Sequence, residues 1–548
     1  MIGHSLHSHL ICAAIFLTFF LCTVRRSVCQ QQHIEGPVSV TVDVSKIHNY
    51  VAPRAMGMHT SVYDNSLSDP KLPELLIAAG ITTLRYPGGG YADIYHWSTN
   101  KATKWRGTDP PQYGYIAANA DVGHFLQLVD KIHGTAIITV NYGSNLAGTG
   151  GGEPAEAAAW VAYTNGDPAD PKVLGKDSTG YDWKTVGYWA GLRAAAALPQ
   201  DDGQNFLRIA HPASFHILYW EIGNELFGNG YYDKDGEGFE EDLHAPYDKD
   251  PKESARQRHK LRKDLSPETY GNGVAAFARA MKAVDPAIKI GAVLNTPPFD
   301  NSWGLDWNPG VLKACGKIID FVVIHWYTGN LLPPDWKVLD DASYLSAPQR
   351  ELPDMMAALL ELFRKYGGEN AQRIQLTVTE LGSRPFAKID DPSIHGLFVA
   401  DAYLSLMEDG AANIDWLELH KDTFLSEKDE KPGPAYFALQ MIHRLAHINA
   451  SILEAKSNNS LLSAHAVQRR DGSVGLMLIN KDPKNSATVK VKITGTTLSA
   501  SGSLFDFDAR NPPSGYITKG GPSAGLGNEF SIQVAPYSIS DVLLLKTQ

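Results

Sequence analysis

Residues 217–225 read ILYWEIGNE, an apolar run rich in aromatic and β-branched side chains that ends in Gly223, Asn224 and Glu225. A short run of this kind, closed by glycine, is typical of a strand buried on both faces. Farther along, Ser266-Pro267-Glu268 supplies an N-cap and a first-turn proline, which predict the start of a helix. The pattern predicts a strand–helix unit with polar residues at the end of the strand.

The same rhythm recurs between about residues 52 and 447. The predicted strands are 55–58, 81–86, 136–141, 217–222, 288–294, 321–325, 375–379 and 414–417. Near-continuously apolar strands that alternate with helices predict a parallel sheet covered on both faces. Eight units over roughly 400 residues suit a (β/α)8 TIM barrel better than an open doubly wound sheet. No G-x-G-x-x-G follows the first strand and no G-x-x-x-x-G-K-[ST] loop occurs, which further weakens the doubly wound alternative.

After residue 450 the pattern changes to short alternating runs separated by Gly, Asn, Pro and Ser. The predicted strands here are 461–467, 474–479, 489–493, 530–534 and 542–545. This spacing predicts a β-sandwich. Residues 38–43 (VSVTVD) alternate in the same way, and we expect this N-terminal strand to pair within the C-terminal sandwich. The predicted fold class is therefore α/β: a TIM barrel plus an all-β sandwich formed by the C-terminal region with an N-terminal strand.

Residues 10–24 are almost wholly apolar, which fits a signal peptide and falls short of the roughly 20 residues that a membrane-spanning helix needs. Ser27 and Cys29 are small residues suited to the −3 and −1 positions of a cleavage site, so we expect a secreted, extracellular chain that begins near Gln30. A signal anchor is the alternative. Three of the four cysteines lie within residues 1–29, which cleavage would remove, and Cys315 alone would remain, without a disulfide partner.

The predicted domains are a signal peptide (1–29), a strand that joins the sandwich (30–51), the catalytic barrel (52–447) and the β-sandwich (448–548). Two glycosylation sequons, at Asn449 and Asn458, lie near the start of the sandwich and would be usable on the secretory route.

The composition narrows the class of protein. The 548 residues are 43% hydrophobic and 20% charged, enough apolar material for a large core, which excludes a disordered or collagen-like chain. A net charge of −11 argues against a non-specific nucleic-acid binder. No second apolar span follows the first, so we expect no membrane contact after signal cleavage; the oligomeric state stays open.

Two glutamates stand at predicted strand ends, Glu225 after the fourth strand and Glu380 after the seventh. Active sites of TIM barrels lie at this end of the strands. Glycoside hydrolysis needs such a pair, one carboxyl as general acid and the other as ionised nucleophile. Arg85 and Tyr327 are donors that would keep a nucleophilic carboxylate charged, and His325 could orient either glutamate.

Other residues near these ends have plainer interpretations. Arg85 could instead be structural and pair an acidic neighbour, and Glu221 is taken as a solvated or salt-bridged residue without a catalytic task. Trp97, Trp326 and Trp416 could line a sugar-stacking surface, although aromatic side chains are also common in cores.

These motifs carry a family resemblance. LRYPGG at 84–89, VNYG at 140–143 with EPAEAAAWV at 153–161, and GNE at 223–225 resemble glycoside hydrolase family 51, the α-L-arabinofuranosidases of the retaining (β/α)8 clan. The resemblance covers roughly residues 38 to 548. It implies that Glu225 is the acid/base, Glu380 the nucleophile, Asn224 a donor to the sugar hydroxyl beside the anomeric carbon, and Asn141 a substrate-binding residue.

The chain also departs from that family. Family 51 usually has asparagine where this chain has Gly90, and a glutamate just after strand one, where this chain reads MHTS at 58–61. TELG at 379–382 is closer to related families that act on pyranosides. The expected function is a retaining glycoside hydrolase of plant or microbial cell-wall polysaccharides or oligosaccharides, arabinofuranosidase-like. The alternatives are a β-glycosidase of a related family (xylosidase, glucuronidase, glucanase or galactofuranosidase) and a non-catalytic sugar-binding protein.

The charged insertion 233–264 follows the strand of Glu225, and we expect a surface loop that overhangs the cleft. Its start resembles a calcium loop, but His244 occupies position twelve, where a bidentate glutamate is needed. No His/Cys cluster has zinc spacing. We therefore expect no metal and no cofactor.

Overall fold

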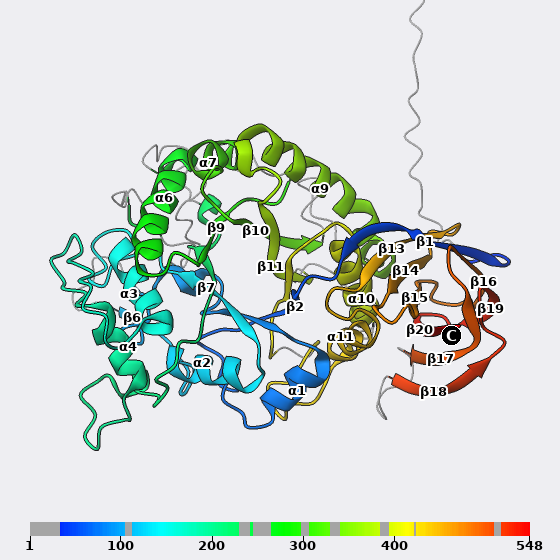
Figure 1. Ribbon diagram of the computed structural model, residues 1–548, viewed down its shortest axis with the longest axis horizontal. Helices are drawn as coiled ribbons and strands as arrows, with labels where there is room; N and C mark the ends of the chain where they lie inside the picture. Colours follow the sequence, from blue (N-terminus) through cyan, green and yellow to red (C-terminus); the bar gives the residue numbers. More distant parts are fainter. Residues whose placement is uncertain are drawn as a thin grey trace, which may run out of the picture. The chain divides into compact units, whose positions relative to one another are not determined.

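The computed structural model describes residues 33–104, 112–228, 242–244, 265–297, 306–328, 340–383, 394–420, 423–508 and 517–547. These residues form a closed parallel barrel surrounded by helices and a mixed sheet built from the C-terminal strands with β1 (Figure 1). Within them, no helix has both the length and the apolar composition required to cross a bilayer.

Eight parallel strands close the barrel in the order β10-β11-β12-β2-β3-β7-β8-β9. Their bounds are β2 Arg54–His59, β3 Thr83–Tyr86, β7 Thr135–Val140, β8 Tyr219–Ile222, β9 Lys289–Val293, β10 Phe321–Thr328, β11 Gln375–Ser383 and β12 Asn413–Trp416. Each of the eight predicted runs is confirmed as a barrel strand. β10 and β11 continue beyond the predicted ends, which brings Tyr327 and Glu380 into the strands themselves.

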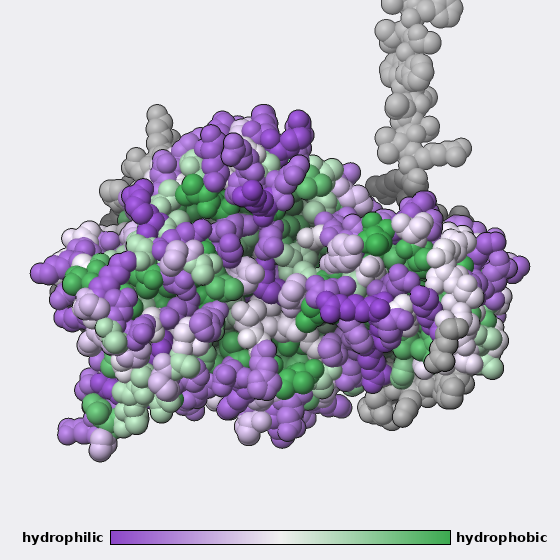
Figure 2. All heavy atoms as spheres, in the orientation of Figure 1, coloured by the Kyte–Doolittle hydropathy of each residue, from purple (hydrophilic) through white to green (hydrophobic). Residues whose placement is uncertain are grey.

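Helices cover the outside of the barrel in Figure 1. They are α1 Leu72–Ala79, α2 Val122–Lys131, α3 Pro154–Asn165, α4 Val186–Ala194, α6 Pro267–Val284, α7 Trp307–Cys315, α8 Asp341–Leu345, α9 Ala347–Tyr366, α10 Ile394–Glu408 and α11 Pro434–Leu445. The predicted cap of α6 is confirmed, because the Ser266 hydroxyl accepts a hydrogen bond from the amide of Thr269. On the face shown in Figure 2, hydrophobic residues occur as scattered groups among hydrophilic ones, as on most folded proteins.

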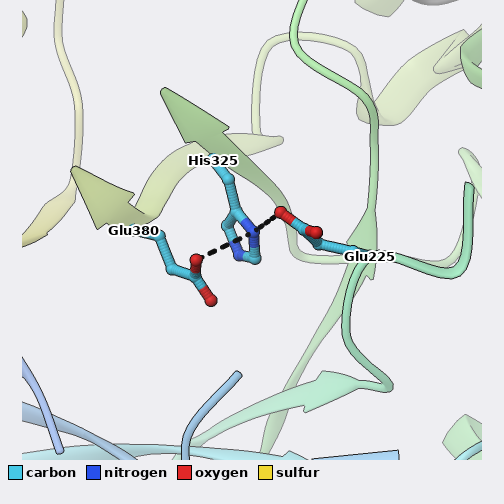
Figure 3. Close-up of side chains that lie close together, drawn as sticks. All are labelled: Glu225, His325 and Glu380. Atoms are coloured by element: carbon cyan, nitrogen blue, oxygen red, sulfur yellow. Dashed lines mark hydrogen bonds and ion pairs between the residues drawn. The ribbon is translucent and has the colours of Figure 1, made fainter. Parts of the chain in front are cut away.

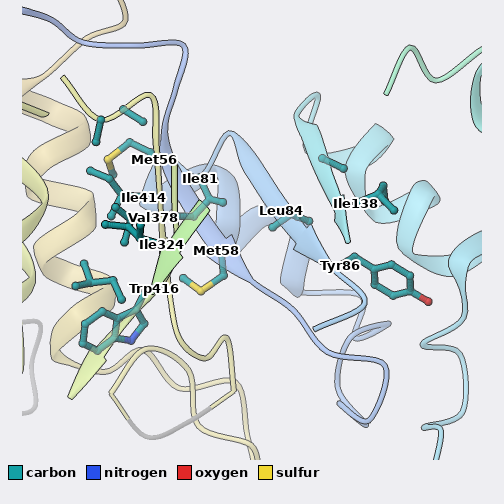
Figure 4. Close-up of a cluster of buried hydrophobic side chains, with 14 of the residues drawn as sticks. Met56, Met58, Ile81, Leu84, Tyr86, Ile138, Ile324, Val378, Ile414 and Trp416 are labelled. Carbon is teal, nitrogen blue, oxygen red and sulfur yellow. The ribbon is translucent and has the colours of Figure 1, made fainter. Parts of the chain in front are cut away.

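Apolar side chains of the strands and helices form one core. Figure 4 shows part of it, with Met56, Met58, Leu84, Ile324 and Trp416 among the buried side chains. This packing accounts for the near-continuous apolar composition of the strands, because both of their faces are covered.

The C-terminal strands form one continuous nine-stranded sheet with the order β18-β17-β20-β15-β14-β13-β1-β16-β19. Their bounds are β1 Val38–Tyr50, β13 Ser451–Ser457, β14 Leu462–Gln468, β15 Val474–Asn480, β16 Ala487–Thr494, β17 Leu498–Asp508, β18 Ile517–Ala524, β19 Glu529–Val534 and β20 Ser538–Lys546. The sheet curls around its own apolar core, to which β1 contributes Val38, Val40 and Val42. The expected pairing of the N-terminal strand within the C-terminal sheet is confirmed: β1 pairs antiparallel with β13 and parallel with β16.

Sequence patterning missed two sets of strands. β13, β17 and β18 were not predicted; β17 and β18 are rich in Ser and Gly, and β18 contains a proline, so their alternation is weak. The small sheet of β4 Tyr95–His96, β5 Lys101–Lys104 and β6 Gln112–Gly114 is too short to show a period.

A buried ionic cluster joins the barrel helix α10 to the sheet. Asp401 on α10 lies 2.8 Å from His465 Nε2 of β14 and 2.5 Å from the ammonium of Lys481. Glu408 lies 2.7 Å from His465 Nδ1. Burial lowers the pKa of His465, but the two carboxylates outweigh it and raise this pKa to about 10. The imidazolium is therefore part of the barrel–sheet contact at neutral pH.

This cluster predicts a loss of stability at alkaline pH. Because the pKa of His465 in the folded protein lies above its ordinary 6.5, its stabilising contribution is complete below about pH 6.5 and is lost as pH rises through 10. We expect the free energy of unfolding, measured by urea titration, to fall between pH 7 and 10, and His465→Gln to flatten this dependence. Equal slopes for the two proteins would contradict the prediction.

Several predictions from the sequence are not tested by the structure. The signal peptide (1–29) lies outside the described residues, as does the insertion 233–264 apart from 242–244. The domain boundaries at 51/52 and 447/448 stay predictions. Asn449 and Asn458 are exposed, and their glycosylation also stays a prediction. Cys315 is buried, and this burial raises the pKa of its thiol to about 12.

Candidate functional site

A bulge in β11 brings two consecutive side chains to the same histidine. Ile324 of β10 is paired with Val378, whereas the next residue, His325, is paired with Glu380, so Thr379 is an extra residue in β11. Neighbouring side chains of a regular strand point to opposite faces, and a bulge breaks this alternation. As a result His325 Nε2 lies 3.0 Å from the Thr379 hydroxyl, and His325 Nδ1 lies 3.5 Å from Glu380 Oε2.

Glu225 approaches this histidine from the turn after β8. Its Oε1 lies 2.6 Å from His325 Nδ1, and Figure 3 shows both glutamates pointing toward the imidazole. The turn carries Gly223 at φ 70° and Glu225 itself at φ 29°, a left-handed conformation that is costly for a residue with a side chain. Asp93 stabilises the turn by accepting the backbone amide of Asn224 at 2.9 Å.

Arg85 of β3 forms ion pairs with a glutamate of β8 and a glutamate of β11. Its Nε and its Nη2 each donate a hydrogen bond of 2.9 Å to one of the two carboxylate oxygens of Glu221. Nη2 also donates to Asn224 Oδ1 at 2.7 Å. Nη1 donates to Glu380 Oε1 at 2.8 Å and to His59 Nδ1 at 3.0 Å. A guanidinium has five N–H groups, so all of its donors are used. Arg85 therefore pairs an acidic neighbour, Glu221, as the structural interpretation expects, and it also contacts Glu380; its role in catalysis stays a prediction.

The surrounding charges favour the ionised form of Glu380. Burial raises the pKa of its carboxyl, but the positive charges of His325 and Arg85 outweigh burial and hold this pKa below its ordinary value. The Tyr327 hydroxyl donates to Glu380 Oε2, and burial together with this carboxylate holds the pKa of Tyr327 well above its usual range. Burial lowers the pKa of His325, but Glu380 and Glu225 raise it overall.

The two glutamates are also close to each other. One carboxylate oxygen of Glu225, one of Glu380 and a ring nitrogen of His325 all lie within 4.8 Å of one another. Glu380 is nearly buried, whereas about a quarter of the Glu225 side chain is exposed. These three side chains lie close enough together to coordinate a metal ion. However, both ring nitrogens of His325 already have hydrogen-bond partners, and the adjacent Arg85 guanidinium disfavours a second positive charge.

The two asparagines predicted for the site, Asn224 and Asn141, are held by hydrogen bonds to other residues of the protein. Asn224 lies in the site, held by Arg85 and Asp93. Asn141 follows β7, where its side chain donates to the Tyr95 carbonyl and accepts the amide of Ser144 at 2.9 Å, so in this structure it shapes the loop.

The three predicted stacking tryptophans have no exposed face. Trp97 stacks on Trp160 in the core, Trp326 donates its indole N–H to Glu351, and Trp416 packs within the cluster of Figure 4. Stacking on a sugar requires an open ring face, so their burial does not support that role.

Sequence reasoning missed three contributors: His59, Asp93 and Thr379. The interpretation of Glu221 as a salt-bridged residue is confirmed by its pair with Arg85. His59 stands at a strand end and could have been found by its position alone. The bulge at Thr379 has no signal in the sequence. The role of Asp93 depends on contacts with the loops after β7 and β8, to the amides of Tyr142, Gly143 and Asn224.

Comparisons with known proteins agree with this architecture. No protein-family model matches the chain. The probable α-L-arabinofuranosidase C of Aspergillus terreus is 22% identical over 346 residues, an alignment that covers 59% of this chain and 52% of that protein. The chain thus spans about half the length of the curated relatives that it matches.

Solved structures resemble the chain over almost its whole length. An α-L-arabinofuranosidase from Thermotoga maritima, crystallised with arabinose, superposes with a TM-score of 0.64 at 17% identity and covers 93% of this chain and 100% of its own. A family 44 xyloglucanase from Paenibacillus polymyxa has a TM-score of 0.59 at 14% identity, covering 93% and 99%. These comparisons agree with the resemblance indicated by the strand-end motifs: the chain has a (β/α)8 barrel and is similar, at low identity, to α-L-arabinofuranosidases, among them enzymes of glycoside hydrolase family 51.

Proposed function

We propose that this protein is a glycoside hydrolase that retains the anomeric configuration. The observation that carries the proposal is the approach of a Glu225 oxygen to within 4.8 Å of a Glu380 oxygen at the mouth of the barrel. Retaining enzymes hold their two carboxyl groups about 5 to 5.5 Å apart, whereas inverting enzymes leave room for a water molecule between them.

The two carboxyl groups have different surroundings, which suits different roles. Glu380 contacts Arg85 and Tyr327 and has a lowered pKa, so it is poised to attack the anomeric carbon as a carboxylate. Glu225 is more exposed and lies 2.6 Å from His325 Nδ1. It would protonate the leaving oxygen and then activate the water that releases the sugar from Glu380.

The first candidate substrate is an α-L-arabinofuranoside of a cell-wall polysaccharide or oligosaccharide. The relatives named above support it, including the one crystallised with arabinose. A β-glycoside is the second candidate, because this chain has Gly90 and His59-Thr60-Ser61 where family 51 has ring-holding asparagine and glutamate residues. Secretion is part of the proposal and is supported by the apolar segment 10–24.

A panel of 4-nitrophenyl glycosides tests the activity: arabinofuranoside, xyloside, galactofuranoside, glucuronide and glucoside. We expect turnover of at least one, unaffected by EDTA, and NMR of the first product formed should show the anomer of the substrate. An inverted product would contradict the mechanism. Sugar binding without hydrolysis of any glycoside would favour the non-catalytic alternative.

A further inference from the structure

A second feature of the barrel mouth is a pocket between the ends of β2 and β12. It has a volume of about 160 Å³, and its walls include His59, Ser61, Tyr63, Asp64, Glu418 and His420. We call it the distal pocket. A cavity of about 150 Å³ accommodates a benzene ring, so the distal pocket has room for one sugar ring or its substituents.

The distal pocket adjoins the nucleophile. The turn Gly88-Gly89 separates them so narrowly that a Cβ on Gly88 would lie 2.9 Å from Ser61 Oγ, and one on Gly89 would lie 3.3 Å from Glu380 Oε1. His59 is linked to Glu380 through Arg85. A ligand bound at Glu380 therefore has the distal pocket as its immediate neighbour.

The order of strands decides which half of the substrate enters this pocket. In the closed barrel, β8, which precedes Glu225, lies four strands from β12 and three from β2. The proposed acid must face the leaving group, so the leaving group lies on the β8 side. The sugar that is attacked by Glu380 then extends toward β12 and β2, into the distal pocket.

Among the described residues that line the distal pocket, the charged side chains are mainly acidic. They include three carboxylates, those of Asp64, Glu418 and Glu427. The cation among the described lining residues is His420, whose pKa burial lowers but the contacts with Asp64 and Glu430 raise to about 9. Its Nδ1 lies 2.5 Å from Asp64 and its Nε2 lies 2.9 Å from Glu430, so neither ring nitrogen is available to a ligand.

The nearest buried cation is equally unavailable, because all five N–H groups of Arg85 are used. Two further polar side chains of the wall, those of His59 and Ser61, are neutral. His59 accepts from Arg85 through Nδ1, and burial holds its pKa at about 3, so the imidazole is uncharged and Nε2 carries the proton. Neither side chain supplies a positive charge to the distal pocket.

We propose that the distal pocket selects a neutral, hydroxylated glycone and rejects one that carries a carboxylate, such as a uronic acid. A carboxylate there would face three like charges and would find no free cation among the described wall residues, a mismatch that discriminates strongly in a partly buried site. Hydroxyl groups, in contrast, can donate hydrogen bonds to these carboxylates. The orientation of the sugar rests on the proposed function, whereas the charge of the pocket does not.

Binding of monosaccharide pairs that differ only at C6 tests this inference without requiring turnover. Glucose and glucuronate, and galactose and galacturonate, are titrated into the whole protein by ligand-observed NMR at low salt. We expect the neutral member of at least one pair to bind at least about tenfold more tightly, and 0.5 M NaCl to narrow the difference because the repulsion is screened. If none of the nitrophenyl glycosides were hydrolysed, the proposed function would be contradicted, but the difference in binding between the neutral sugars and the uronates would still stand.

Charge reversal at the rim supplies the matched comparison. Glu427 is exposed, so Glu427→Lys should fold normally. We expect it to reduce the affinity difference between the neutral sugar and its uronate at least about threefold. Glu369→Lys makes the same change on an exposed residue just before β11, at the opposite end of the barrel, and should leave the difference unchanged. Tighter binding of the uronates, no binding of any of the four sugars, or equal effects of the two variants would overturn the inference.

Discussion

Replacing Glu380 with glutamine is expected to lower kcat by at least about 10⁴-fold on every substrate that the protein hydrolyses. The amide keeps the size of the side chain and can still accept from Tyr327, but it cannot form the glycosyl ester that double displacement requires. The measurement is steady-state kinetics on an activated nitrophenyl glycoside and on an unactivated oligosaccharide. Glu351→Gln is a suitable control, because Glu351 is buried but accepts a hydrogen bond from Trp326 outside the site.

The contrast with Glu225→Ala makes this prediction specific. A nitrophenolate leaving group needs no protonation, so the first step should survive in Glu225→Ala, and a glycosyl intermediate should accumulate as a burst of nitrophenol. The unactivated oligosaccharide should lose activity almost completely. Equal losses on both substrates, or a Glu380→Gln variant that retains turnover, would contradict the assignment of the two roles.

The barrel was predictable because its strands are apolar on both faces and recur at regular intervals, which constrains the topology. Glu225, Glu380, Arg85, His325 and Tyr327 were found for the same reason: a parallel barrel brings all strand ends to one mouth. The strand pairing of β1 was also predictable from its alternation. These parts of the fold depend on local pattern and on topology.

The remaining features depend on packing detail that local pattern does not carry. The bulge that brings Thr379 and Glu380 to the same histidine is a property of two strands in register. The tryptophans at strand ends were ambiguous because an indole suits a core as well as a sugar. The use of all five Arg85 donors could not be predicted, because it requires four partners from the ends of three strands, β2, β8 and β11, to meet one guanidinium.

Arg85 is expected to have the largest single effect on stability. It is fully buried between Glu221 and Glu380, and Arg85→Met would leave both carboxylates without their guanidinium partner. Removing one partner of a buried ion pair costs about 3 to 5 kcal/mol, and this loss should appear in the free energy of unfolding measured by urea titration. Arg85→Lys, which keeps the charge with fewer donors, should lose less and guards against a variant that fails to fold.

The pH dependence of kcat separates this electrostatic role from a merely structural one. Because Arg85 lowers the pKa of the Glu380 carboxyl, its loss should raise that pKa and move the acidic limb of the profile to higher pH. Arg193 is the matched control: it is also buried, but its guanidinium donates to backbone carbonyls, among them those of Tyr163 and His211. Arg193→Met should lose stability without moving the limb. If both arginine variants left the acidic limb at the wild-type pH, the charge of Arg85 would not control the ionisation of Glu380.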